Sequence, residues 1–132
     1  MLIDRWINDG SAPVLEQMLR FTAARHRLIA ENVVNISTPG YRQKDLSLER
    51  FQKMLADRAE QARSLAPGAT RFDDIVGQSG DPHRGVLFHD GQNRSMEQLM
   101  SDQAKNALMH NLAIELLRRQ FQTIETALKE RP

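Results

Sequence analysis

The sequence predicts an all-α fold in which long N- and C-terminal helices pair as an antiparallel coiled coil, with a shorter middle helix and an irregular, glycine-rich central segment. Apolar residues recur at alternating spacings of three and four at both ends of the chain, which is the period of helices that pack lengthwise. Aliphatic side chains and 6 Met supply the apolar content, whereas 5% of residues are aromatic, a composition that favours helices over sheets. The 132 residues allow one domain at most.

The first helix is expected over residues 11–36. Ser11 is a suitable N-cap, and Pro13 fits the first turn, where a missing N–H costs nothing. Seven positions spaced by four and three residues form its heptad seam: Leu15, Leu19, Thr22, His26, Ile29, Val33 and Ile36. Further apolar residues widen this seam into a broad face: Val14, Met18, Phe21 and Leu28. Pro39 and Gly40 fit the central positions of a type II turn, which ends the helix.

The middle of the chain divides into two segments. Residues 37–65 are expected to hold the Pro-Gly turn and a middle helix that begins near Asp45. Residues 66–93 contain five glycines and show no apolar period, so they are expected to be irregular apart from a short strand over 86–88. A segment of this length without regular structure is unusual inside a compact domain.

The C-terminal helix is expected over residues 94–129, opened by a capping box of Ser95 and Gln98. Its seam is Met96, Met100, Gln103, Ala107, His110, Ile114, Leu117, Phe121, Ile124 and Leu128. Such a helix is about 52 Å long, more than the diameter of a compact domain of this size. Between 107 and 117, eight of eleven residues are apolar, which requires partners on several sides. Neighbouring subunits and a three-helix bundle within the chain both explain this excess.

No arrangement of residues predicts catalysis, a metal or a cofactor, so an enzyme is not expected. The chain has no Cys, which excludes disulfides and thiolate zinc sites, and it carries no nucleophile elbow, Walker loop or zinc-protease motif. His83 and His89 match no zinc spacing. His26 and His110 lie on the predicted seams, where a partly buried, hydrogen-bonded role is expected.

Charge and hydropathy argue against nucleic-acid binding and membrane insertion. The formal net charge is +1, and the cluster of Arg20, Arg25 and Arg27 is flanked by Glu16 and Glu31, as on a solvated helix face. Nowhere do 18 consecutive apolar residues occur. The N-terminal residues lack the apolar core of a cleaved secretory signal.

Two segments resemble one protein family. Residues 32–41, which read NVVNISTPGY, resemble the signature at the end of the N-terminal helix of bacterial flagellar basal-body rod, hook and related axial proteins. Residues 92–100, which read QNRSMEQLM, are similar to the segment that opens the C-terminal helix in this family. The short chain and the stretch around Leu117 are most similar to a rod subunit. The resemblance implies an assembly motif of Asn32, Asn35, Thr38, Pro39, Gly40 and Tyr41.

The resemblance implies a structural role in the flagellar rod, in the periplasm, reached by the flagellar export apparatus without a cleaved signal. The expected partners are copies of the chain, other rod proteins, and the membrane-embedded ring of the basal body or its adaptor. The rod would transmit torque and line the export channel. Within one subunit, the pairing seams would bear Leu15, Leu19, Ile29, Val33, Ile36, Met100, Ile114, Leu117, Phe121, Ile124 and Leu128. The remaining apolar face would pack on neighbouring subunits.

A second interpretation is a soluble helical adaptor that binds partner helices with a Met-rich face. It predicts a stable monomer or small oligomer, whereas a rod subunit gains part of its core from its neighbours.

Overall fold

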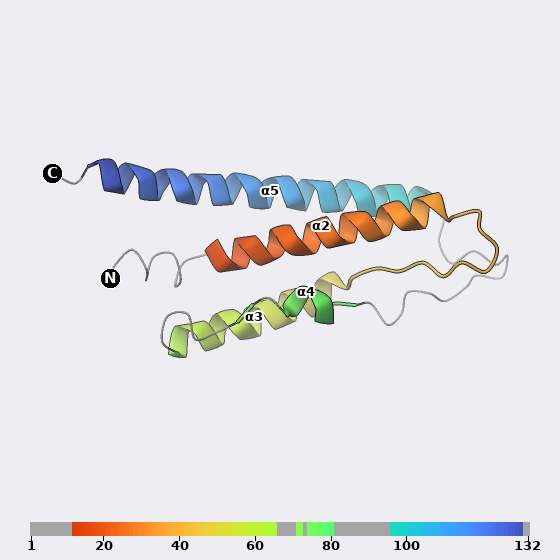
Figure 1. Ribbon diagram of the computed structural model, residues 1–132, viewed down its shortest axis with the longest axis horizontal. Helices are drawn as coiled ribbons and strands as arrows, with labels where there is room; N and C mark the ends of the chain where they lie inside the picture. Colours follow the sequence, from red (N-terminus) through yellow and green to blue (C-terminus); the bar gives the residue numbers. More distant parts are fainter. Residues whose placement is uncertain (1–11, 66–70, 73, 81–95, 131–132) are drawn as a thin grey trace.

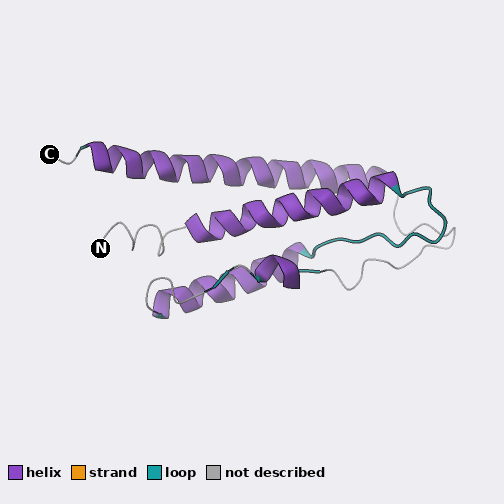
Figure 2. Cartoon of the chain, in the orientation of Figure 1, coloured by secondary structure: helices purple, strands orange, loops and turns teal. Residues whose placement is uncertain are grey.

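The computed structural model describes residues 12–65, 71–72, 74–80 and 96–130. These residues form four helices: α2 (Ala12–Val34), α3 (Leu48–Ser64), α4 (Ile75–Gln78) and α5 (Met96–Lys129). Among them the β-type pairing is a single antiparallel bridge between Leu46 and Gly80. The all-α prediction is therefore confirmed over the described parts of the chain (Figures 1 and 2).

The helix α2 lies between α5 on one side and the α3–α4 unit on the other (Figure 1). Followed from Ala12 to Val34, α2 runs against the direction of α5, and the two helices contact each other along their length. With 23 and 34 residues, they are about 34 Å and 51 Å long. The predicted pairing of the long helices is confirmed, and it makes α2 the centre of the subunit.

Two neighbouring faces of α2 bury side chains against different partners. Leu15, Thr22 and Ile29 repeat every seven residues and are buried, and Thr22 is hydrogen-bonded to His110 and Asn106 of α5. The residues that were expected to widen the seam lie on the adjacent face and pack with α3 and α4: Val14, Met18 and Phe21. Because successive residues of a helix are rotated by about 100°, two heptad sets that are one residue apart line two adjoining faces.

The apolar core lies between α2, α3 and α4. Phe21 and Phe51 stack with ring centroids 4.2 Å apart and planes 18° from parallel. Leu55 and Ile75 complete the buried cluster, and Met109 of α5 packs against its edge. Aromatic stacking and complete burial hold the α3–α4 unit on α2 at this point.

Helix ends differ from the predicted ones by up to three residues. The helix α2 ends at Val34, two residues early, and α3 begins at Leu48 instead of near Asp45. Ser47 caps α3 by accepting a hydrogen bond from the Arg50 N–H, 3.3 Å away. The segment that was expected to be irregular contains the short helix α4.

Several predictions lie outside the described residues. These are the Ser11 cap, the Ser95 part of the capping box, the strand over 86–88, and the surroundings of His83 and His89. None of the described helices combines the length and hydropathy that crossing a bilayer would need.

Candidate assembly surface

Asn32 ties the chain that leaves α2 back onto the helix. Its side-chain amide donates to the Lys44 carbonyl at 2.7 Å, and its Oδ1 accepts from the Lys44 N–H at 3.0 Å. The side chain is fully buried. A buried amide that bonds to both backbone polar groups of one residue fixes the position of that residue, so Asn32 holds Lys44, and with it the chain after the turn, against α2.

The turn after α2 is built by the other residues of the motif. The Asn35 side chain donates to the Glu31 carbonyl at 2.9 Å, and the Thr38 N–H donates to the Asn35 carbonyl at 2.9 Å. The Tyr41 N–H donates to the Thr38 carbonyl at 3.2 Å, and Gly40 has a φ of 73°. This hydrogen bond and this φ confirm the predicted type II turn around Pro39 and Gly40. All six motif residues therefore lie at or just beyond the end of α2.

Arg25 and Asp45 form a second tie, seven residues or about two helical turns before Asn32. Nε and an Nη of Arg25 donate to the two carboxylate oxygens at 3.0 and 3.1 Å, and the side chains are 12% and 2% exposed. Arg25 was expected on a solvated face, and that interpretation is wrong for this residue. Arg20, by contrast, pairs with Glu16 on the exposed surface. The side of α2 that bears Arg25 and Asn32 is covered by the segment that holds Lys44 and Asp45, which the charge pattern did not reveal.

The α5 face that meets α2 is displaced by one residue from the predicted seam. Its buried residues are Leu99, Asp102, Asn106 and Ala113, and each precedes a predicted seam position. One residue corresponds to a rotation of about 100°. Accordingly, six of the ten predicted seam residues are exposed within the single chain: Met96, Met100, Ala107, Ile114, Phe121 and Leu128. Leu117 and Ile124 are half-buried on the α5 side, and so are Leu19, Val33 and Ile36 on or after α2.

Polar contacts join α5 to α2 in this orientation. Asn106 donates to the Thr22 carbonyl at 2.8 Å, and Thr22 Oγ1 is hydrogen-bonded to His110 Nδ1 at 2.7 Å. The prediction of a partly buried, hydrogen-bonded histidine is thus confirmed for His110. His26 is exposed, so the same prediction is wrong there.

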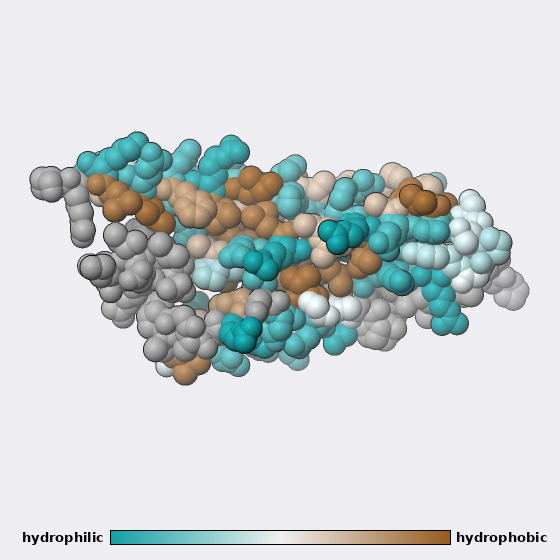
Figure 3. Space-filling view, viewed as in Figure 1, coloured by the Kyte–Doolittle hydropathy of each residue, from teal (hydrophilic) through white to brown (hydrophobic). Residues whose placement is uncertain are grey.

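The exposed apolar residues of α5 form two stripes. The first, here called stripe 1, contains Met96, Met100, Ile114, Phe121 and Leu128. The second, stripe 2, contains Leu108, Leu112 and Leu116, one turn apart, with exposures of 72%, 54% and 40%. At about 100° per residue the two stripes lie on different sides of the helix, each away from the α2 contact. Figure 3 shows hydrophobic side chains gathered along α5 in one view.

The stripes show that none of the helices described in the structure covers all of the apolar excess over 107–117. Leu112 and Leu116 remain exposed, and α3 and α4 pack on α2 instead. Monomers rarely expose contiguous apolar surface of this kind unless another molecule covers it. The geometry therefore makes α5 the candidate assembly surface.

Comparison with known proteins agrees with this geometry. No protein-family model matches the chain. It is 24% identical over 130 residues to the flagellar basal body rod protein FlgB of Escherichia coli (strain K12), with 92% of this chain and 94% of that protein covered. FlgB of Bacillus subtilis (strain 168) is also 24% identical, over 124 residues, with 91% and 94% covered. The chain is thus similar to FlgB along nine-tenths of its length.

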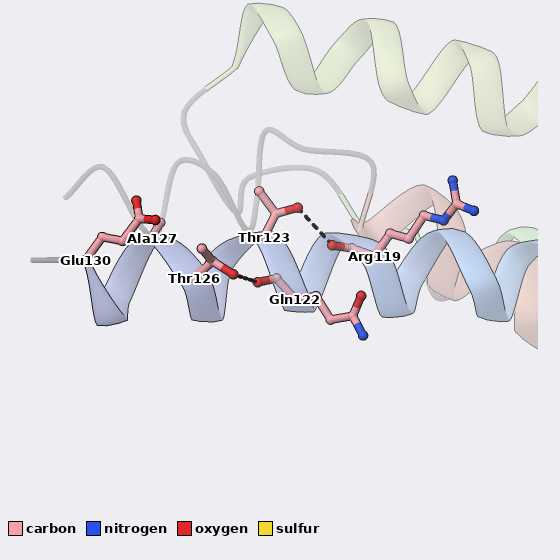
Figure 4. Close-up of a pocket in the computed structure, with 6 residues that line it drawn as sticks. All are labelled: Arg119, Gln122, Thr123, Thr126, Ala127 and Glu130. Atoms are coloured by element: carbon pink, nitrogen blue, oxygen red, sulfur yellow. Dashed lines mark hydrogen bonds between the residues drawn. The ribbon is translucent and has the colours of Figure 1, made fainter.

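A shallow hollow on α5 is lined by Arg119, Gln122, Thr123, Thr126, Ala127 and Glu130 (Figure 4). The Thr123 hydroxyl donates to the Arg119 carbonyl and the Thr126 hydroxyl to the Gln122 carbonyl, each at 2.9 Å. Both hydroxyls are thus occupied by the backbone of their own helix. In the described ranges no three His, Asp or Glu side chains are grouped to hold a metal ion.

Sequence reasoning missed the residues that join distant segments of the FlgB-like chain. Asp45 and Ser79 are buried outside any apolar period, and Asn106 is a buried polar residue at the heptad position between Leu99 and Ala113. The Ser79 carbonyl accepts from the Ser47 N–H at 2.7 Å, which joins the chain after α4 to the start of α3. For Asn106 the one available signal was this heptad spacing, because a polar residue stands where the heptad positions on either side are apolar.

Proposed function

We propose that this FlgB-like chain is a structural subunit of the flagellar basal-body rod, which assembles helically with copies of itself and with other rod proteins. The observation that carries the proposal is the outward position of the apolar residues of α5, on two sides of one helix. Similarity to FlgB over nine-tenths of the chain supports the same role.

The two stripes suit an assembly that propagates. A self-complementary patch would give a closed dimer, whereas two different patches on one helix contact two different neighbours and continue the assembly. Stripe 1 and stripe 2 are patches of different composition, one with Met and Phe and one with Leu alone. We therefore assign Met100, Ile114, Phe121 and Leu128 to contacts between subunits, and Leu15, Ile29 and the half-buried Leu117 and Ile124 to the contact within a subunit.

Transmission of torque follows from such contacts in this proposal. Many apolar contacts along a 34-residue helix resist sliding and rotation of one subunit against the next without any chemical step. Tight packing of the α5 helices around the rod axis would also line the export channel. The Asn32 tie and the Gly40 turn would fix where each chain leaves this inner layer.

The remaining partners follow from the position of a rod. A rod subunit at the membrane end would contact the membrane-embedded ring or its adaptor, and it would reach the periplasm by the flagellar export apparatus without a cleaved signal. Nucleic acid and direct membrane insertion have no place in this role.

The test is whether the chain co-purifies with detergent-extracted basal bodies, and whether stripe 2 is needed. Leu112→Asp places a charge in stripe 2, and Asn111→Asp places the same charge on the neighbouring exposed residue. We expect the parent chain and Asn111→Asp in the basal bodies and Leu112→Asp to be absent from them. A parent chain that is missing from basal bodies and bound to a partner helix elsewhere in the cell would instead establish the adaptor.

A further inference from the structure

The contact between α2 and α5 consists of layers spaced by one heptad. Asn106 of α5 is bonded to Thr22 of α2, which places these two residues opposite each other. Seven residues toward the start of α2 and seven toward the end of α5 give Leu15 and Ala113. Seven residues the other way give Ile29 and Leu99. All six side chains are buried, as expected when antiparallel helices pack in register.

The middle layer is polar between two apolar layers. Thr22 is completely buried and Asn106 is 2% exposed, with His110 half-buried beside them. Across the described residues, the Asn106 Oδ1 is buried and accepts no hydrogen bond. An unpaired buried acceptor costs free energy, so stability alone does not explain an asparagine at this position.

The free-energy cost of burying Asn106 is offset by selectivity, because the sequence offers other ways of packing α5 on α2 that Asn106 disfavours. Stripe 1 follows a heptad and offers α2 a second, more apolar face of the same helix. If α5 turned by one residue or slid by a heptad, the hydrogen bond between the Asn106 amide and the Thr22 carbonyl would be lost. Both groups would then be unpaired within an apolar contact. A single buried polar position is known to select register and partner in paired helices for this reason.

We infer that the layer of Thr22, Asn106 and His110 (the polar layer) determines the register in which α5 lies on its own α2, and thereby which faces of α5 stay available to other chains. The first part concerns the isolated subunit and is independent of its role. The second part rests on the proposed rod function. Removing the polar layer would let α5 turn stripe 1 inward, or let it pair with the α2 of another chain.

Disulfide cross-linking measures the register directly, because the natural sequence has no Cys. Leu15→Cys with Ala113→Cys reports the observed register, and Leu15→Cys with Gln120→Cys reports a slip of one heptad. In the parent background we expect the first pair to cross-link at least about tenfold more than the second, since a slip leaves buried polar groups unpaired. In the Thr22→Val/Asn106→Leu background we expect similar yields for both pairs, together with disulfides between chains.

Two comparisons keep the test decisive. Asn111→Leu makes the same substitution at an exposed site of α5 and should keep the tenfold preference. Thr22→Ser keeps the hydroxyl and should also keep the tenfold preference. A double variant that stays monomeric in the original register overturns the inference. Loss of helical circular dichroism in that variant also overturns it, because the layer would then be required for folding and not for selecting a register. Absence of the parent from basal bodies would refute the rod function and leave the register result intact.

Discussion

Arg25 of α2 binds both carboxylate oxygens of Asp45, and the carboxylate is almost entirely shielded from water. Removal of one member of a buried pair leaves the other charge unpaired and desolvated. We expect Arg25→Met to lower the free energy of unfolding by about 3 kcal/mol, measured by urea denaturation. Arg20→Met is the matched control, because the Arg20–Glu16 pair is more than half exposed. Its effect should stay within about 1 kcal/mol, and equal effects at the two sites would contradict the buried tie.

Asn32→Asp tests the tie between Asn32 and Lys44. The carboxylate still accepts from the Lys44 N–H, but it no longer donates to the Lys44 carbonyl, and the two oxygens repel. Local opening of residues 41–47 should become easier by about 2 kcal/mol, seen as faster hydrogen exchange at Lys44, while α5 exchanges as before. Asn35→Asp also loses a bond to a carbonyl, at a partly exposed site where water replaces it, and should cost under about 1 kcal/mol. Unchanged exchange at Lys44 would show that Asn32 does not hold this segment.

The Gly40 turn is tested by a pair of alanine substitutions. A Cβ at Gly40 or at Gly77 would meet no atom within 4 Å, so a steric clash is absent at both sites. Gly40 alone of these two has a positive φ, 73°. Gly40→Ala should therefore cost about 1 kcal/mol, whereas Gly77→Ala should be neutral or stabilise by up to about 1 kcal/mol. Thermal unfolding checks both, and a stable Gly40→Ala variant would mean that the turn adopts another form.

Two phenylalanines separate folding from assembly. Phe51 is buried in the stack with Phe21, so Phe51→Ala should destabilise the subunit by about 4 kcal/mol. Phe121 is 59% exposed in stripe 1, and Phe121→Ala should change the stability of the subunit by less than about 0.5 kcal/mol. In contrast, we expect Phe121→Ala to reduce incorporation into basal bodies. Normal incorporation would remove Phe121 from the contacts between subunits.

The elements with a strong local signal were predictable. Heptad spacing and the Pro39–Gly40 pair determine two long helices and a turn with little help from the rest of the chain, and Leu15 and Ile29 are buried. The rotation of α5 was not predictable from its period, because apolar residues lie on three of its sides and periodicity does not rank them. The choice depends on Asn106 and Thr22, which are 84 residues apart.

Long-range polar pairing was hidden for the same reason. Arg25 looks like its neighbours Arg20 and Arg27 in any count of charges, and what distinguishes it is Asp45, twenty residues away. The ties made by Asn32 and Ser79 likewise involve backbone groups, which no residue type reveals. Only the fold shows which polar residues meet.

The balance of the interior has a calorimetric consequence. Among the described residues, eight buried side chains are hydrophobic and eight are polar. Exposure of apolar surface raises the heat capacity on unfolding and exposure of polar surface lowers it, so the isolated subunit should have a shallow curve of stability against temperature. Covering the two stripes of α5 removes apolar surface from water. Association should therefore show a negative heat-capacity change. This change would report the burial of apolar surface between subunits, which contributes little to the stability of the isolated monomer.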